Sequence, residues 1–260
     1  MSVSFLYCRR MDLVTISAGY VRSPCQILND ASLMVYYPFS TTDTYNDYGV
    51  NICNGVGSGT TLVSSGRVGQ ALLFTSNASY FQAPCFARTR ANYISFTISM
   101  WVNPNSTTGG GSLMHISSLS NGSGLCYDLL GLTSSGNIVT QWLMTAAIVN
   151  GTLGPVIPAN TWTHVAVVYQ SSTGIRVFLN GQLVSGSSNT GNINVYESSA
   201  VASPWYMTLG NISPLGASAV VNCLSGPTPI AAGAFPGQID EFRVYNRDLN
   251  GEELCVLANP

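Results

Sequence analysis

The segment from Thr161 to Val184 restricts the fold most strongly. It contains two runs in which apolar and polar residues alternate, Thr161–Tyr169 and Gly174–Val184, and Asn180-Gly181 interrupts the second run. Alternation with period two is typical of half-buried strands, and Asn-Gly readily adopts the two positive φ angles of a tight hairpin turn. The segment therefore predicts antiparallel strands joined by short turns.

The same alternation recurs along the chain. It is clearest in Tyr93–Val102, where Phe96, Ile98 and Met100 share one face and polar residues occupy the other. Further strands are expected at Leu33–Phe39, Gly69–Phe74, Ser79–Gln82, Leu113–Ile116, Leu125–Leu132, Asn137–Met144, Trp205–Leu209 and Pro236–Arg247, and a short helical turn at Gly251–Leu257. Strands at this spacing, separated by Gly/Ser/Asn turns, predict an all-β fold built as a two-sheet antiparallel sandwich.

Composition restricts the function. The chain is 46% hydrophobic and only 8% charged, it has no lysine, and its net charge is -2. Nucleic-acid binding requires a field of basic residues against phosphate, which this charge balance excludes, and the absence of lysine excludes lysine-based catalysis. Such a neutral, Ser/Thr- and Gly-rich chain is typical of extracellular sandwich domains.

The two ends of the chain indicate where the folded domain begins and ends. Residues 1–24 have no clear period and are interpreted as a leader or the remnant of an upstream segment, whereas residues 25–260 are expected to form one domain. No apolar run approaches the roughly 18–20 residues of a membrane helix. The first ten residues do not resemble a signal peptide, so we expect secretion to be encoded elsewhere in a larger protein.

Seven cysteines lie at positions 8, 25, 53, 85, 126, 223 and 255, and the chain has two histidines. No pair has C-x-x-C spacing, so a zinc site is not expected. Scattered cysteines in a chain of this polarity indicate disulfides and an oxidising compartment; the alternative is buried free thiols in a cytosolic protein. Sequons at Asn77, Asn105, Asn121, Asn150 and Asn211 are about as many as chance gives, and they are compatible with a secreted glycoprotein.

Five landmarks appear in a fixed order: Val35–Phe39 with the Asn46-Asp47 loop, Gly66–Leu72, Phe96–Val102, Trp162–His164 with Leu179–Gly181, and Gly237–Arg247. Together they resemble the laminin-G-like jelly roll of the concanavalin A-like lectin/glucanase superfamily, over about Leu33 to Leu257. The resemblance implies a non-catalytic recognition or adhesion module that binds glycan or protein partners. A purely structural spacer and a glycan-cleaving hydrolase are the alternatives.

The sequence lacks the catalytic residues that the hydrolase alternative requires. Retaining glucanases of this superfamily carry Glu-x-Asp-x-Glu on one strand, and no such triplet occurs here. Asp240-Glu241 and Glu252-Glu253 are adjacent pairs, and neighbours on a regular strand face opposite sides. His115 and His164 lie within strands without a nucleophile elbow. We therefore expect no enzyme activity.

Asp240 lies inside an apolar strand, where an unpaired carboxylate is costly. The resemblance implies a structural calcium site, because the closing-strand Asp of relatives lies near the loop after the first strand. The ligands of Ca²⁺ would be Asp240, Asp43, Asn46, Asp47 and Asn51. The alternative is a carboxylate that accepts hydrogen bonds from backbone N–H groups or from Arg243.

Aromatic residues give weaker indications of a ligand site. Tyr196 and Tyr206 flank the long segment Ser185–Pro204 and are the candidate ligand-binding residues. Trp101, Trp142 and Trp205 could stack on sugars, but core packing is the default for them. Trp162 and His164 share one face of a strand, and for His164 we expect burial with a hydrogen bond.

The jelly-roll resemblance also implies a disulfide pattern. Its terminal strands are neighbours, which places Cys25 near Cys255. Cys53–Cys85 would attach the first loop to the sheet, Cys126–Cys223 remains by elimination, and Cys8 is the odd thiol.

Overall fold

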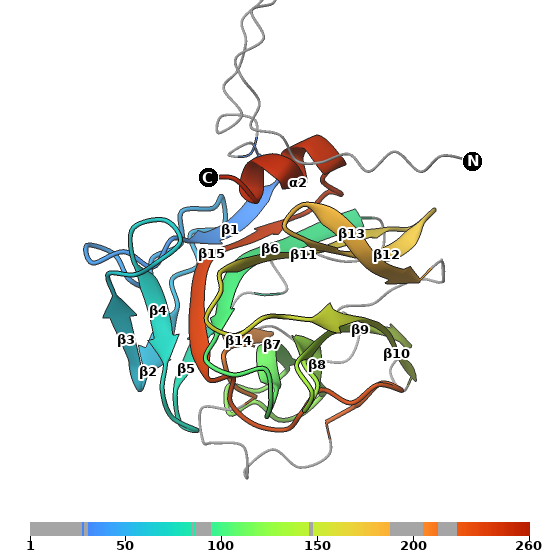
Figure 1. Ribbon diagram of the computed structural model, residues 1–260, viewed down its shortest axis with the longest axis horizontal. Coiled ribbons are helices and arrows are strands. Elements are labelled where there is room, and N and C mark those ends of the chain that lie inside the picture. Colours follow the sequence, from blue (N-terminus) through green and yellow to red (C-terminus); the bar gives the residue numbers. More distant parts are fainter. Residues whose placement is uncertain are drawn as a thin grey trace, which may run out of the picture.

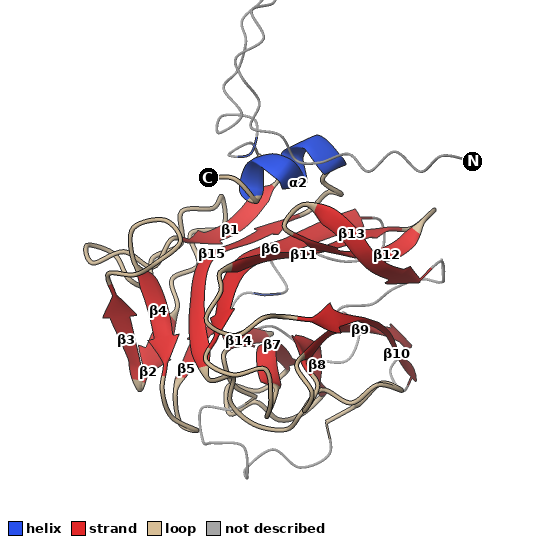
Figure 2. Cartoon of the chain, in the orientation of Figure 1, coloured by secondary structure: helices blue, strands red, loops and turns tan. Residues whose placement is uncertain are grey.

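Two antiparallel sheets pack face to face in the computed structural model, which describes residues 28, 31–84, 86, 95–145, 148–187, 205–212 and 223–260 (Figures 1 and 2). The large sheet contains β1 (Leu33–Tyr37), β3 (Thr60–Val63), β4 (Ala71–Phe74), β6 (Ser95–Pro104), β11 (Thr163–Gln170), β12 (Gly174–Leu179), β13 (Gln182–Ser187) and β15 (Gly237–Tyr245). Its order is β13-β12-β11-β6-β15-β4-β3, and β1 also pairs with β15.

The small sheet contains β2 (Val56–Ser58), β5 (Tyr80–Ala83), β7 (Gly111–Ser117), β8 (Cys126–Leu132), β9 (Asn137–Thr145), β10 (Ile148–Val156) and β14 (Tyr206–Leu209). Its order is β10-β9-β8-β7-β14-β5-β2. The predicted jelly-roll sandwich is confirmed.

Period-two alternation builds the core between the sheets. Along β6, Phe96, Ile98 and Met100 are fully buried in the central cluster, which also contains Met207 and Leu209 from the small sheet. The intervening residues of β6 face the outer side of the large sheet, away from this core.

The predicted Asn-Gly hairpin is confirmed. Asn180 and Gly181 have φ angles of 50° and 77°, and they join Leu179 of β12 to its partner Gln182 of β13. Two positive φ angles match the twist of the flanking strands, which is why Asn-Gly is favoured at this turn.

The helix α2 (Gly251–Leu257) packs on the outer face of the large sheet (Figure 1). Asn250 and Glu253 form a capping box that starts the helix. Leu254 and Leu257 join a second cluster with Val168 and Tyr245. The helical turn predicted at Gly251–Leu257 is confirmed, and it covers only part of that face.

Three strands were not expected from the sequence: β2, β3 and β10. β10 contains Gly151, Gly154 and Pro155 and lies at a sheet edge, where residues that disfavour strands are tolerated.

A second difference lies in β15. Glu241 has a φ of 55° and the register shifts between Asp240 and Arg243, so a β-bulge interrupts the alternation. Asp240 pairs with outward-facing Trp101, and Glu241 accepts a hydrogen bond from Tyr36, which packs beside α2. The expectation that these two acids face opposite sides is therefore wrong: both lie on the outer side of the large sheet.

A disulfide joins Cys126 to Cys223, which is the pairing expected from the sequence. Cys53 and Cys255 are also disulfide-bonded. Their expected partners, Cys85 and Cys25, lie outside the described residues, as does Cys8. In the part of the chain that the structure describes, no helix has the length and hydrophobicity needed to span a membrane.

Candidate functional site

A row of three side chains crosses the outer face of the large sheet. Trp101 of β6 pairs with His164 of β11 on one side and with Asp240 of β15 on the other. The Trp101 ring lies 5.3 Å from the His164 ring, and its Nε1–H donates to the Leu257 carbonyl at the end of α2, at 3.2 Å. The sequence placed these residues in three separate motifs, and the sheet brings them together.

His164 has a structural role in this row, as expected. It is 1% exposed, and its Nε2 forms a 2.8 Å hydrogen bond with the Ser99 hydroxyl. Burial, together with the Arg243 charge, lowers the pKa of His164 to about 3. The ring is therefore neutral at physiological pH.

Asp240 anchors the turn between β3 and β4. Its Oδ2 accepts a hydrogen bond from the Val68 backbone N–H at 2.9 Å. The side chain is fully buried, and burial raises the pKa of Asp240 to about 7. Arg243, the alternative partner considered from the sequence, instead forms an ion pair with Glu241.

An open pocket of about 460 Å³ lies above Trp101, next to the end of α2. Its lining residues are Arg67, Trp101, Trp162, Asn180, Gln182, Ala258 and Asn259. They come from β6, the β3–β4 turn, the residue before β11, the β12–β13 hairpin and the C-terminal segment. A volume of this size is within the range of small-ligand sites.

Hydrogen bonds hold the walls of the pocket in place. The Trp162 Nε1–H donates to the Ser65 carbonyl at 3.2 Å, which ties the start of β11 to the β3–β4 turn. The Asn180 Oδ1 accepts from the His164 backbone N–H at 2.9 Å, which ties the hairpin to β11. The guanidinium carbon of Arg67 lies 4.6 Å from the centre of the Trp101 ring, within cation–π distance.

The pocket combines an aromatic surface with neutral hydrogen-bonding groups and one cation. Trp162 is half-buried, whereas Arg67, Gln182 and Asn259 are exposed. None of the seven lining residues is acidic. Such a lining can pack against an apolar ring face and hydrogen-bond to hydroxyl or anionic groups around it.

The predicted calcium ligands have different surroundings. Asp47 is buried, and three backbone N–H groups donate to its carboxylate: Tyr36 and Gly49 to Oδ1 at 2.8 and 2.7 Å, and Cys53 to Oδ2 at 2.7 Å. This carboxylate therefore organises the loop after β1 through hydrogen bonds.

The other predicted ligands do not join it. Asp43 accepts hydrogen bonds from the Asn46 side-chain amide and the Tyr48 hydroxyl, at 2.7 and 2.8 Å. Among the described residues, only one cluster of three His, Cys, Asp or Glu side chains is close enough together to hold a metal ion. This cluster does not contain Asp43, Asp47 or Asp240. The cluster consists of His115, Cys126 and Cys223, and its two sulfurs are bonded to each other. The carboxylates of Asp43, Asp47 and Asp240 are therefore not close enough together to bind one metal ion as a group. Asn51 also takes part in interactions within the protein.

The aromatic candidates also lie elsewhere. Tyr206 is half-buried in β14 and pairs with Ser117 of β7, outside the pocket. Tyr196 lies outside the described residues. Trp142 and Trp205 are core residues, as expected by default. Arg67, Gln182 and Asn259 were not predicted as site residues, because no local sequence pattern connects them.

Among the sequons, Asn211 is fully buried, and its side-chain amide donates to the carbonyls of Asn77 and Ser79. Asn211 is therefore inaccessible to glycosylation in the folded chain, whereas Asn77, Asn105 and Asn121 are exposed.

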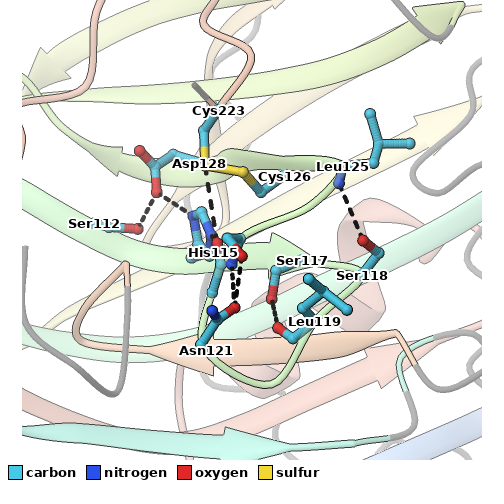
Figure 3. Close-up of a disulfide and its surroundings, with 12 residues drawn as sticks. Ser112, His115, Ser117, Ser118, Leu119, Asn121, Leu125, Cys126, Asp128 and Cys223 are labelled. Atoms are coloured by element: carbon cyan, nitrogen blue, oxygen red, sulfur yellow. Dashed lines mark hydrogen bonds and ion pairs between the residues drawn. A yellow bond between two sulfur atoms is a disulfide. The ribbon is translucent and has the colours of Figure 1, made fainter. Parts of the chain in front are cut away.

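The outer face of the small sheet also carries polar side chains (Figure 3). The Nδ1 of His115 lies 3.0 Å from the Asp128 carboxylate, and its Nε2 lies 2.9 Å from the Gly122 carbonyl. Both partners are acceptors, so both hydrogen bonds form only when the ring carries two protons. Ser112 donates to the same Asp128 oxygen at 2.7 Å rather than to His115, so this trio does not activate a serine nucleophile.

Two segments cover this face. From the loop 118–125, the Ser120 carbonyl accepts from the Gln82 amide, and Gly122 binds His115. In the segment 223–236, the Gly226 N–H donates to the Gln141 side chain, and Ile230 lies over Gly131 of β8, where a side chain on the glycine would clash. The Cys126–Cys223 disulfide ties this second segment to the sheet (Figure 3).

Solved structures share this fold at low sequence identity. Domain 4 of the extracellular GH43 arabinanase AbnA from Geobacillus stearothermophilus, solved with arabinotriose, is 19% identical with a TM-score of 0.55, covering 88% of this chain and 98% of that one. A Trypanosoma rangeli sialidase, in complex with 2,3-difluorosialic acid, is 16% identical with a TM-score of 0.56, covering 88% and 33%. The binding domain of botulinum neurotoxin DC in complex with SialylT is 14% identical with a TM-score of 0.59, covering 89% and 52%.

These similarities support the fold alone, and the chain spans only a third of the sialidase and about half of the neurotoxin binding domain. A search of curated proteins found no match. The profile of the Laminin_G_3 family, described as the concanavalin A-like lectin/glucanases superfamily, matches residues 75–255. That match covers β5 to β15 and most of α2. With the jelly-roll sandwich observed in the structure, it establishes that the chain belongs to the concanavalin A-like lectin/glucanase superfamily.

Proposed function

We propose that this chain is a non-catalytic extracellular recognition module that binds a saccharide in the pocket above Trp101. The observation that carries the proposal is the half-buried Trp162 indole beside Arg67 and the amides of Asn180, Gln182 and Asn259 in an open pocket. A sugar ring presents an apolar face that packs on an indole, and its hydroxyls require donors and acceptors like these amides.

One of the similar solved structures is consistent with this proposal. Domain 4 of the arabinanase, of which the similarity covers 98%, was solved with arabinotriose. A disulfide in a laminin-G-like domain supports an extracellular location. A protein partner or a purely structural spacer remains the alternative, and neither requires the pocket to bind a sugar.

The acids near the pocket support a non-catalytic role. Glycoside hydrolysis uses two carboxyl groups that flank the scissile bond. Asp240 is fully buried beneath the β3–β4 turn, and Glu241 is 4% exposed and bonded to Tyr36 and Arg243. Neither lines the pocket. We therefore expect no release of reducing sugar from β-glucans, and sustained release by the purified chain would argue for a hydrolase.

A glycan array tests the proposal with three proteins: wild type, Trp162→Ala, and Tyr48→Ala. Tyr48 is a suitable control because it is a 53% exposed aromatic residue outside the pocket lining. We expect Trp162→Ala to weaken binding about tenfold or more, a loss of about 1.4 kcal/mol, and Tyr48→Ala to bind like wild type. Absence of glycan binding by the wild type, or equal binding by Trp162→Ala, would reject the pocket as the saccharide site.

A further inference from the structure

We propose that the saccharide bound in this pocket carries an anionic group, a carboxylate or a sulfate ester, and that Arg67 binds that group. The inference rests on the proposed function, because it names the class of ligand for the same pocket. It starts from the charge of the lining: Arg67 is its single charged residue.

The guanidinium of Arg67 has no acidic partner in the part of the chain that the structure describes, and this distinguishes it from two other arginines. Arg243 forms an ion pair with Glu241, and Arg247 binds Glu253 at 2.7 Å. Arg67 is exposed, and none of the residues that line the pocket with it is acidic.

The geometry holds Arg67 in place before a ligand binds. Arg67 lies in a tight turn in which the Gly66 N–H donates to the Gly69 carbonyl at 3.2 Å, and Val68 is anchored on Asp240. The guanidinium carbon lies 4.6 Å from the centre of the Trp101 ring, and a cation–π contact of this kind leaves N–H groups for a bidentate contact. Carboxylate and sulfate oxygens match that fork geometry, whereas a sugar hydroxyl does not.

The other pocket residues complete the recognition of a charged sugar. Trp162 offers a ring surface, and the hairpin residues Asn180 and Gln182 offer amides across the pocket. Asp240, the acid beneath the turn, is fully buried, accepts a hydrogen bond from the Val68 backbone N–H and does not line the pocket. An anion at Arg67 therefore meets no acidic side chain of the lining.

Matched saccharide pairs test this inference by titration calorimetry. The panel contains 3′-sialyllactose with lactose, and a sulfated chondroitin disaccharide with its unsulfated form. We expect wild type to bind at least one anionic member about tenfold or more tightly than its neutral counterpart, and the better pair identifies carboxylate or sulfate as the group. Arg67→Gln should abolish the preference, because it should weaken binding of the anionic member much more than binding of its neutral counterpart. Arg67→Lys should retain only part of it, because lysine keeps the charge without the planar fork.

The outcomes separate this inference from the proposed function. If neutral and anionic members bind equally and Trp162→Ala weakens both, the inference is overturned and the saccharide site stands. If Arg67→Gln keeps the full anion preference with a melting temperature like that of wild type, the inference is also overturned. If no member of the panel binds and the glycan array is also negative, both proposals fail.

Discussion

The outer faces of the two sheets differ in whether their polar side chains are bonded within the protein or exposed. On the small sheet, the side chains of Gln82, His115 and Gln141 bond to backbone groups of the covering segments 118–125 and 223–236. On the large sheet, α2 covers one part of the face and leaves Arg67 and Gln182 exposed around a pocket. Buried polar groups are normally satisfied inside the protein, so the first face is structural and the second is available to a ligand.

Removing the disulfide that holds the cover of the small sheet should have the largest effect on stability. The Cys126→Ala/Cys223→Ala double variant loses a cross-link that closes a loop with a sequence separation of 97. The chain-entropy model gives a loss of about 4–5 kcal/mol in the free energy of unfolding, measured by urea denaturation. Saccharide binding should persist under native conditions, because the pocket contains no residue of the cover. A loss of binding in a folded double variant would show that the two faces are not independent.

Asp240 and His164, the two neighbours of Trp101, should contribute to stability with opposite dependence on pH. Burial raises the pKa of Asp240 from 3.8 to about 7, so its contribution to stability is present below about pH 4 and is lost as pH rises to about 7. Burial lowers the pKa of His164 from 6.5 to about 3, so its contribution is present above about pH 6.5 and is lost as pH falls. Between pH 4 and 6.5 the two contributions oppose each other.

Single variants should therefore change stability with opposite slopes. We expect the unfolding free energy of Asp240→Asn, relative to wild type, to increase with pH by up to about 1.4 kcal/mol per pH unit. That of His164→Asn should decrease with pH over the same window. Denaturant unfolding at several pH values measures both slopes, and slopes of the same sign would contradict the assignment of charge states. In addition, Asp240→Ala should lower thermal stability, because it removes the acceptor for Val68.

A smaller loss is expected in the loop after β1. Asp47→Ala removes the acceptor of three backbone N–H groups and should cost about 2–3 kcal/mol in unfolding free energy. We expect EDTA to leave the melting temperature of wild type unchanged, because three backbone N–H groups already donate to this carboxylate. A fall in melting temperature with EDTA, reversed by calcium, would restore the calcium interpretation of Asp43, Asn46, Asp47 and Asn51.

Local patterns predicted most of the strands but not the site. Asn180-Gly181 is a short-range signal, and the turn predicted for it formed with two positive φ angles. The sequence did not indicate that Asp240 contacts the β3–β4 turn, where it accepts a hydrogen bond from Val68. Residues 237–239 of β15 pair with β4, whereas residues 242–245 pair with β1, so Asp240 lies at the change of partner and next to the β3–β4 turn. The strand order, which local sequence patterns do not reveal, determines which turn Asp240 lies next to.

The pocket was unpredictable for the same reason. Arg67, Trp162 and Gln182 are distant in sequence, and three separate turns bring them together above Trp101. The bulge at Glu241 was equally hidden, because a glutamate at positive φ has no sequence signature.

We propose that the large sheet binds a saccharide on its outer face and that the small sheet does not. Hydrogen exchange with and without the tightest-binding saccharide of the panel defined above tests it most directly. We predict protection in residues 65–70, 160–164 and 179–183, which form the pocket walls, and unchanged exchange in 118–125 and 223–236. Protection confined to the segments that cover the small sheet, or at neither face, would contradict the account.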